Sequence, residues 1–290
     1  MDAVALALVS ALLFAGMTVA LRVALRGHPE AEAGAAATAL VGLLVALAAT
    51  AILDGGVGRP AAGELAIFAL TGLLAPGASG VLFVLAIRDA GSSRASVVVG
   101  TAPLFGATMA IVFLDEPVRP ALVAGALLVV CAGFLLVRDP VRPPSFRHAG
   151  IAFAFATTLL FSTRDVIVRW YAGESEIGSL DAAAAAIAVA TLVALAWAAL
   201  AARRSGRPLL RPGLVRFVPA GILFGLSYVL LFEAYFRGRV TVVSPLVATE
   251  SLWGVLLSAL VLRRSELVGR RLVLGAALIV AGGALISAYR

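Results

Sequence analysis

The sequence predicts an all-α integral membrane protein with ten transmembrane helices, arranged as two inverted five-helix repeats. Three observations lead to this prediction. Hydrophobic residues make up 62% of the 290 positions and charged residues only 13%, against roughly 45–50% and about 25% in a soluble domain. Charged or Gly/Pro-rich breaks divide the chain into ten apolar segments, each near the length of about 20 residues that crosses a bilayer. The second half of the chain also repeats the residue pattern of the first half.

The ten apolar segments are expected to be helices, because backbone amides inside a bilayer have no water to bond. They are also about twice as long as the strands of a membrane barrel. The connections between them are short, so we expect the functional site to lie inside the bundle. The first segment lacks the basic start of a signal peptide, and we expect it to be a retained span. The expected spans are 2–21, 33–53, 64–87, 93–114, 119–137, 149–170, 178–202, 214–236, 240–262 and 267–288.

Two pairs of segments show the internal repeat most clearly. The stretch "LLFAGMTVALR" at 12–22 aligns with "LLFSTRDVIVR" at 159–169, at a shift of 147 residues. The stretch "GTAPLFG" at 100–106 aligns with "ATESLWG" at 248–254, at a shift of 148 residues. The pattern therefore indicates two copies of one unit.

The two copies are expected to form units at residues 1–138 and 147–290. Each unit holds five expected spans. Because five is an odd number, the second copy must enter the membrane from the opposite side. Inverted pairs of this kind are the architecture of many secondary transporters, which bind their substrate near the bilayer midplane between the repeats.

Each copy closes with a turn that bears a glutamate and a span that contains glycine: "FLDEPVRPALVAGALLVVCAGFLLV" at 113–137 and "LRRSELVGRRLVLGAALIVAGGALI" at 262–286. With this signature in both copies, the chain resembles the EamA-type members of the drug/metabolite transporter superfamily over essentially its whole length. The resemblance implies a ten-span transporter with a cytoplasmic N-terminus, and a substrate among amino acids, amines, nucleotide precursors or drugs. The second copy departs from the usual pattern at Ser251, which replaces the proline found at Pro103.

The signature glutamates, Glu116 and Glu266, are expected to stand at helix N-termini. The helix macrodipole favours negative charge there, so we interpret both as structural caps. The arginines do not agree with the orientation that the resemblance implies. Most of them fall on the side that it makes external, whereas the positive-inside rule places them in the cytoplasm.

Four charged residues occupy expected spans of the second copy where the first copy has uncharged ones. A charge at the centre of a spanning helix costs about 2.5–3.5 kcal/mol on insertion scales, and such residues usually face a cavity or one another. We therefore interpret the four as candidates for a site that binds a substrate or a coupling ion. They are Arg164 in place of Met17, Asp165 in place of Thr18, Glu233 in place of Leu85 and Glu250 in place of Ala102.

A purely structural network is the alternative interpretation of these charges. Asp165 and Arg169 are four residues apart, a spacing that allows an ion pair along one helix. Arg164 could instead pair with Glu250 and hold two spans together. Glu250 is the strongest candidate for a function, because it falls in the middle of the ninth expected span. It also follows Pro245, which removes a backbone hydrogen-bond donor and predicts a bend.

Aromatic residues mark the same region. In the comparison of the repeats, Tyr228 and Trp253 add polar-tipped rings to the second copy, while Phe14 and Phe161 form a symmetric pair. Ordinary helix packing, or a position at the membrane interface, is the alternative for these rings. In the first copy, "GLLAPGASG" at 72–80 predicts a bend at its proline.

Together these features predict a secondary active transporter, rather than an enzyme, that exports amino acids or related small metabolites by alternating access. Carboxylates left over by Arg164 could carry a proton or hold a cationic group, and Arg164 could meet a substrate carboxylate. A zwitterionic substrate and proton coupling are therefore both expected. The sequence has no phosphate-binding loop for ATP. An intramembrane enzyme that uses Asp165 and Glu250 as acid and base, and a non-transporting assembly or receptor subunit, are the alternatives.

The expected partners are the small-molecule substrate and the lipid bilayer, with a homodimer left open. The net charge of +7 comes from arginines in short loops, so no nucleic-acid partner is expected. No cofactor or metal is expected either, because His28 and His148 lie in separate loops without a second ligand at metal spacing. The expected location is the inner (cytoplasmic) membrane, which the chain crosses several times.

Overall fold

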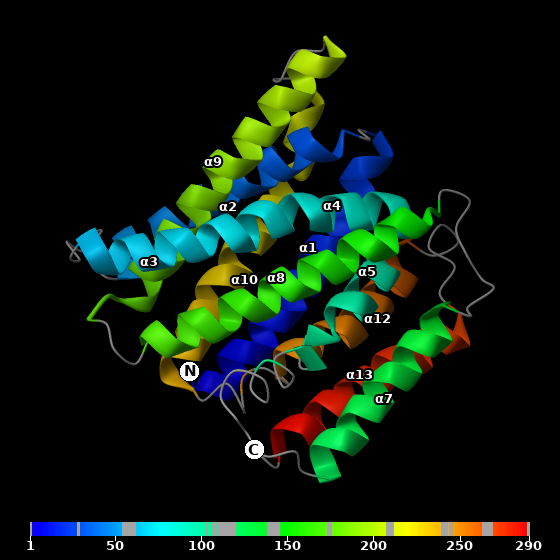
Figure 1. The fold of residues 1–290 in the computed structure, drawn as a ribbon. Coiled ribbons are helices and arrows are strands. Elements are labelled where there is room, and N and C mark those ends of the chain that lie inside the picture. Colours follow the sequence, from blue (N-terminus) through cyan, green and yellow to red (C-terminus); the bar gives the residue numbers. More distant parts are fainter. Residues whose placement is uncertain are drawn as a thin grey trace.

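The computed structural model shows the chain as a bundle of helices (Figure 1). Regular structure is helical throughout the described residues, so the all-α prediction is confirmed for this part of the chain. The described residues are 2–27, 30–53, 62–102, 104–105, 109, 120–137, 146–172, 176–206, 212–238, 243, 246–262 and 269–288.

Six helical segments are long and apolar enough to cross a membrane. They coincide with the first three and the sixth to eighth expected spans, so the prediction of a multi-pass membrane protein is confirmed. The segments are Ala3–Gly27 (α1), Ala31–Leu53 (α2), Leu65–Ala90 (most of α3, then η1 and α4), His148–Ala172 (α8), Ser179–Ser205 (α9) and Gly213–Arg237 (most of η2, then α10).

The other four expected spans contain shorter helices within the described residues. The ten-span layout and the inverted orientation of the two halves therefore stay predictions. The shorter helices are α5 (Ser92–Val99), α7 (Pro120–Val137), α12 (Glu250–Leu262) and α13 (Arg270–Ala288).

The third spanning segment is broken near its middle, as the sequence predicts. It consists of α3 (Ala62–Gly72), η1 (Leu73–Ala78) and α4 (Ser79–Ala90). Within η1, Ala75 leaves the helical conformation, with φ −145° and ψ 121°, immediately before Pro76. Proline has no backbone N–H, so it cannot continue the helical ladder at this point. The break leaves the backbone of Ala75 buried inside the bundle.

The helices pack in pairs that correspond under the internal repeat. The repeat relates α1 to α8, and α4 to α10 (Val218–Arg237). In the structure α1 packs against α10, and α8 packs against α4. Two further pairs, α2 with α9 and α7 with α13, each join a helix to its equivalent in the other half. This exchange of partners supports a two-copy chain, although the boundaries of the two units stay a prediction.

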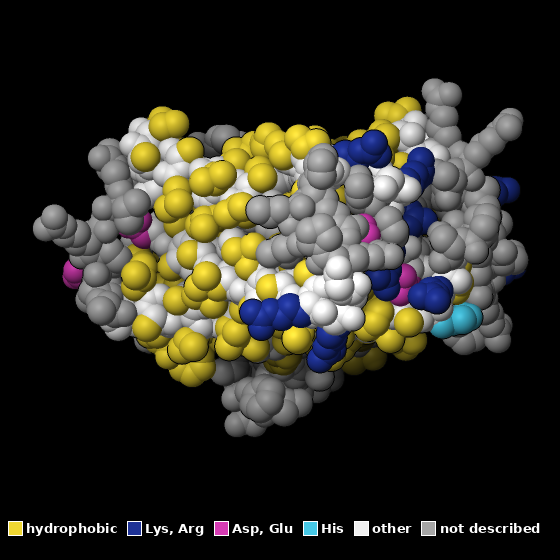
Figure 2. Space-filling view, turned by 90° about the horizontal axis from the view of Figure 1, so that it is seen from above, with side chains coloured by type: hydrophobic (Ala, Val, Ile, Leu, Met, Phe, Trp, Pro, Cys, Tyr) yellow, Lys and Arg dark blue, Asp and Glu magenta, His cyan; other side chains and the backbone are white. Residues whose placement is uncertain are grey.

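The surface separates apolar and basic side chains. Figure 2 shows hydrophobic side chains over much of one face, and basic side chains gathered toward one end of it. Outward-facing leucines such as Leu44, Leu192 and Leu260 are between 60% and 69% exposed. In a membrane protein such side chains face lipid, which is as apolar as leucine itself. Arginines lie in the last turns of α1, α9 and η2 (Pro212–Phe217), at helix ends.

Candidate functional site

A polar cavity lies where α1, α5, α8 and α10 meet the segment 246–250. About 520 Å³ of space in and around it is filled by no atom, counting the part that is open to solvent. Six of the eight predicted site residues line it, which brings together residues from both halves of the chain. They are Phe14, Phe161, Arg164, Asp165, Tyr228 and Glu250.

Arg164, on α8, is the centre of the polar contacts. Its Nε lies 2.7 Å from Oδ1 of Asp165, and its side chain is 4% exposed. Its Nη1 donates a hydrogen bond to the hydroxyl of Tyr228. Its guanidinium carbon lies 4.9 Å from the ring centre of Tyr228 and 5.3 Å from that of Phe161, within cation–π distance of both. The positive charge of Arg164 is therefore engaged on several sides.

Tyr228 connects Arg164 to the broken segment. Its hydroxyl accepts from Arg164 and donates to the carbonyl oxygen of Ala75 at 2.9 Å. In a continuous helix that carbonyl would be expected to accept a hydrogen bond from an amide four residues later. At the break it accepts one from a side chain on α10 instead. One relay thus joins α8, α10 and η1.

Asp165 and Glu250 have different surroundings. Asp165 has Arg164 as a direct partner. Glu250 is 5% exposed and lines the cavity at the start of α12, yet it makes no hydrogen bond or ion pair with any described residue. A buried charge without a partner is strongly unfavourable in a folded protein. A bound proton or a bound cation would therefore stabilise Glu250 in this cavity.

Two predicted site residues lie outside the cavity. Glu233 accepts a hydrogen bond from Ser179 and pairs with Arg237, four residues further along α10. Trp253 is 38% exposed and is not part of the lining. The expected bend at Pro245 and the expected caps lie outside the described residues, and the residues concerned are Glu116, Pro245 and Glu266.

Neither of the ion pairs considered from the sequence is present among the described residues. Asp165 pairs with its neighbour Arg164 rather than with Arg169. Arg169 donates to the backbone carbonyl of Tyr235 at 3.3 Å. Arg164 makes no ion pair with Glu250 either, so the two do not bridge α8 and α12 directly.

A tyrosine and two serines of the lining are not among the site residues that the sequence predicts. Tyr235 lies two helical turns after Tyr228 on the same face of α10, and its buried hydroxyl has no well-directed hydrogen bond to any described residue. The hydroxyl of Ser10 donates to the carbonyl of Ser227 at 2.8 Å, and the hydroxyl of Ser227 donates to the carbonyl of Ser10 at 3.0 Å. The seven-residue spacing of the tyrosines was the available signal.

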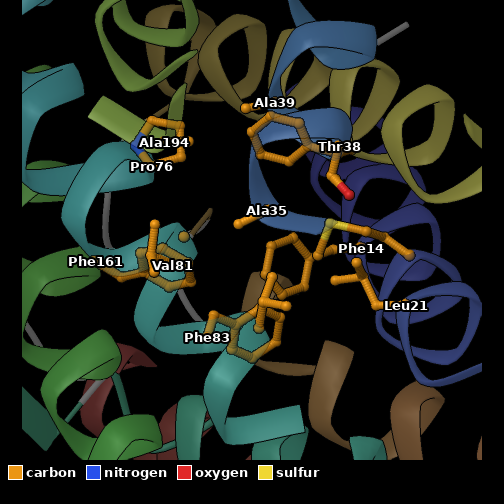
Figure 3. Close-up of a pocket in the computed structure, with 14 residues that line it drawn as sticks. Phe14, Leu21, Ala35, Thr38, Ala39, Pro76, Val81, Phe83, Phe161 and Ala194 are labelled. Atoms are coloured by element: carbon orange, nitrogen blue, oxygen red, sulfur yellow. The ribbon is translucent and has the colours of Figure 1, made fainter. Parts of the chain in front are cut away.

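A second cavity adjoins the polar one, and its lining is almost entirely apolar. It lies among α1, α2, η1, α4, α8, α9 and α10 (Figure 3), with about 450 Å³ of unfilled space that includes the part open to solvent. Phe14 and Phe161 line both cavities. Their rings meet edge to face with centres 5.9 Å apart, and the ring of Phe83 packs against both, at 5.3 and 6.2 Å. Two aromatic side chains thus form a shared wall.

The sequence model of the EamA-like transporter family matches residues 1–138 and 148–288. The chain belongs to the EamA-like transporter family. The resemblance to the drug/metabolite transporter superfamily is therefore confirmed, and the site lies in a protein whose family consists of membrane transporters rather than enzymes. No curated protein matches the chain.

The fold of this EamA-like chain is also similar to that of a solved structure titled "Crystal structure of protein". The TM-score is 0.68 and the sequence identity 22%, over 98% of this chain and 95% of the other. At this identity the similarity establishes the fold alone. Among the described residues of the EamA-like chain, no group of three His, Cys, Asp or Glu side chains is placed to hold a metal ion.

Proposed function

We propose that this EamA-like protein is a secondary active transporter of the cytoplasmic membrane. It exports amino acids or related small metabolites that carry an amino group, by alternating access and in exchange for protons. The observation that carries this proposal is the position of Glu250: a buried carboxylate that lines a cavity and makes no direct hydrogen bond or ion pair with a described residue.

A single unpaired carboxylate provides a simple means of coupling substrate export to proton uptake. A proton and a positively charged amino group both satisfy Glu250, but they cannot occupy it at the same time. When a proton binds, the amino group must leave, and the reverse holds on the other side of the membrane. This mutual exclusion converts an inward flow of protons into an outward flow of substrate.

The broken third segment supports alternating access. Secondary transporters commonly place discontinuous helices at the substrate site, between two repeats that move around it. Here the break at Ala75 is joined to Arg164 through Tyr228. The paired packing of the two halves supports the inverted-repeat layout as part of the same proposal.

A zwitterionic substrate such as an amino acid would engage Arg164 as well as Glu250. Its carboxylate would have to displace Asp165 from Arg164, because these two side chains are already paired at 2.7 Å. The hydroxyl of Tyr235, without a well-directed hydrogen bond among the described residues, could then receive the displaced carboxylate.

Transport by purified protein in liposomes tests the proposal. A panel of amino acids and amines is loaded inside, and efflux is measured with and without a proton gradient. We expect efflux of at least one amino-group compound to be accelerated by the gradient, and Glu250→Gln to lose this acceleration. Glu233→Gln is the matched control, because Glu233 forms an ion pair with Arg237 outside the cavity.

Three results would contradict the proposal. Chemical conversion of a panel compound would favour the intramembrane enzyme. Binding without movement across the membrane would favour a receptor or assembly subunit. Gradient-driven efflux that is unchanged in a folded Glu250→Gln variant would show that Glu250 is not the coupling group.

A further inference from the structure

A groove on the outside of the bundle lies between α1, η2, the start of α10 and α12. We infer that this groove binds one anionic phospholipid, with the lipid phosphate beside Arg216 and a section of one acyl chain along α1. The groove shares no lining residue with the polar cavity. The inference is therefore independent of the proposed transport function and concerns a second site.

The size and polarity of the groove suit a hydrocarbon chain. A volume of about 290 Å³ is available in it, whereas an apolar cavity of about 150 Å³ can bind benzene. Among its described lining residues, Arg216 alone carries a charge, and the others are apolar side chains and a glycine. Val23 and Val261 at its edges are 48% and 55% exposed. The groove therefore opens toward the lipid that surrounds a membrane protein.

The groove follows the depth of one leaflet of the bilayer. Four of its lining residues stand three or four positions apart on α1 and therefore share one face of that helix: Gly16, Val19, Ala20 and Val23. Gly16 is near the middle of α1, and Gly27 ends it. At about 1.5 Å per residue, these two glycines are about 16 Å apart. This is roughly half of a hydrocarbon core that is about 30 Å thick.

Arg216 lies where the head group of such a lipid would be. It stands in the last turn of η2, and its guanidinium occupies the place that a Cβ at Gly27 would take. The C-terminal end of a helix favours a positive charge, which helps to hold the guanidinium there. Arg26, in the last turn of α1, adds a second positive charge at this end. Basic pockets between membrane helices bind anionic lipid head groups.

The guanidinium of Arg216 is available to a phosphate. Its side chain is exposed, and it makes no hydrogen bond or ion pair with any described residue. A guanidinium can bind a phosphate through two parallel hydrogen bonds. The groove also joins the two halves of the chain, because Leu257 and Val261 of α12 face the residues of α1 across it. A ligand that binds only the folded protein stabilises it, so the lipid should stabilise the packing of α1 against α12.

Native mass spectrometry of the purified full chain in detergent tests the inference through the affinity of the first bound lipid. The main probe is dioleoyl-phosphatidylglycerol, which is anionic. Dioleoyl-phosphatidylcholine has the same chains without a net charge, and glycerol phosphate has the phosphate without the chains. We expect phosphatidylglycerol to bind about fivefold more tightly than phosphatidylcholine, as one arginine near the membrane surface would provide. Glycerol phosphate should not bind measurably.

Two variants, each with a matched control, separate the head group from the chain. Arg216→Gln should weaken phosphatidylglycerol about fivefold and leave phosphatidylcholine unchanged. Arg204→Gln, at an exposed arginine in the last turn of α9 outside the groove, should change neither. Ala20→Phe fills the groove and should weaken both lipids severalfold, whereas Ala48→Phe, at an exposed position on α2, should weaken neither. Ala20→Leu replaces Ala20→Phe if the larger ring prevents folding, which thermal unfolding reports.

The inference is overturned if the two lipids bind equally, or if Arg204→Gln weakens phosphatidylglycerol as much as Arg216→Gln does, since the charge of the whole surface would then be responsible. It is also overturned if a folded variant with a filled groove binds both lipids as the unchanged protein does. Binding of glycerol phosphate as tight as that of phosphatidylglycerol would make a free phosphate, rather than a lipid, the ligand. Because Arg216→Gln replaces an exposed side chain, it tests the head group in a folded protein.

Discussion

At the scale of single residues, the site depends on the contrast between two carboxylates in one cavity. Asp165 has a neighbouring guanidinium and contributes a neutral pair. Glu250 has no such partner among the described residues. The first is suited to holding Arg164 in position, and the second to binding something that comes and goes. Their different roles follow from their neighbours, since both are carboxylates in the same cavity.

Removing one partner of the Arg164–Asp165 pair should destabilise the protein more than removing both partners. Arg164→Ala and Asp165→Ala each leave a buried charge behind, at about 3–5 kcal/mol, whereas the double variant leaves neither. We therefore expect the double variant to unfold at a higher temperature than at least one of the single variants, measured in detergent. Losses that simply add would show that the two side chains do not stabilise each other.

The two tyrosines of α10 provide a matched comparison. Tyr228→Phe removes the hydroxyl that joins Arg164 to Ala75 and leaves buried polar groups unpaired, which costs about 1–3 kcal/mol. Tyr235→Phe removes a hydroxyl with no well-directed hydrogen bond to a described residue. Thermal unfolding should show the larger loss for Tyr228→Phe. Equal losses would mean that the relay through Tyr228 does not contribute to stability.

The comparison of the two repeats predicted much of the candidate site, but not its pairing. It identified Arg164, Asp165 and Glu250 as charges that one half has and the other lacks. It also selected Glu233 and Trp253, because position along a span does not say which side of the helix faces the cavity. The partner of Glu233 shows the difficulty: Ser179 is 54 residues away and is brought close only by the packing of α9 on α10.

At the scale of helices, the broken segment and its close contact with α9 set the position of Ala75. Proline in a run of small residues predicts a break, and the structure has one at that place. The sequence could not show that the freed carbonyl meets Tyr228, because that contact joins residues 153 positions apart. Spans read from hydropathy alone agree with the six long helices because the bilayer imposes the same length on each.

The contact between α3 and α9 depends on a glycine. A Cβ at Gly72 would overlap the backbone of Ala186, whereas a Cβ at Gly63, in the same helix, would meet nothing. We expect Gly72→Ala to lower the unfolding temperature. Gly63→Ala should leave it unchanged or raise it, since alanine is favoured over glycine within a helix by about 1 kcal/mol. A stable Gly72→Ala variant would show that α3 and α9 pack less tightly than described.

The break itself is expected to matter for movement more than for stability. Pro76→Ala restores a backbone N–H, so a straighter helix becomes available. Substrate efflux from liposomes should slow severalfold while the binding affinity changes little. Pro219→Ala is the control, because Pro219 stands at the start of α10, where proline is well tolerated. Unchanged efflux by Pro76→Ala would remove the break from the transport cycle.

At the scale of the whole molecule, a nearly symmetric frame encloses an asymmetric site. Helices pack with partners that exchange under the repeat, yet Arg164, Asp165 and Glu250 all come from the second half. The first half contributes Ser10, Phe14 and the carbonyl of Ala75. One copy thus supplies the charges and the other supplies hydroxyl, ring and backbone groups around them.

The neutral Arg164–Asp165 pair, beside a lone Glu250, has an electrical consequence. If Glu250 carries one monovalent cation outward and one proton inward, each cycle moves no net charge across the bilayer. A voltage, which acts on a moved elementary charge by about 2.3 kcal/mol per 100 mV, then has nothing to act on. Exchange in liposomes clamped with potassium and valinomycin should keep the same rate at either polarity and respond only to the pH difference. A current that accompanies exchange would indicate either a substrate without net charge, such as a zwitterion, or a second titrating group in the cycle, for which Asp165 would be the first to test.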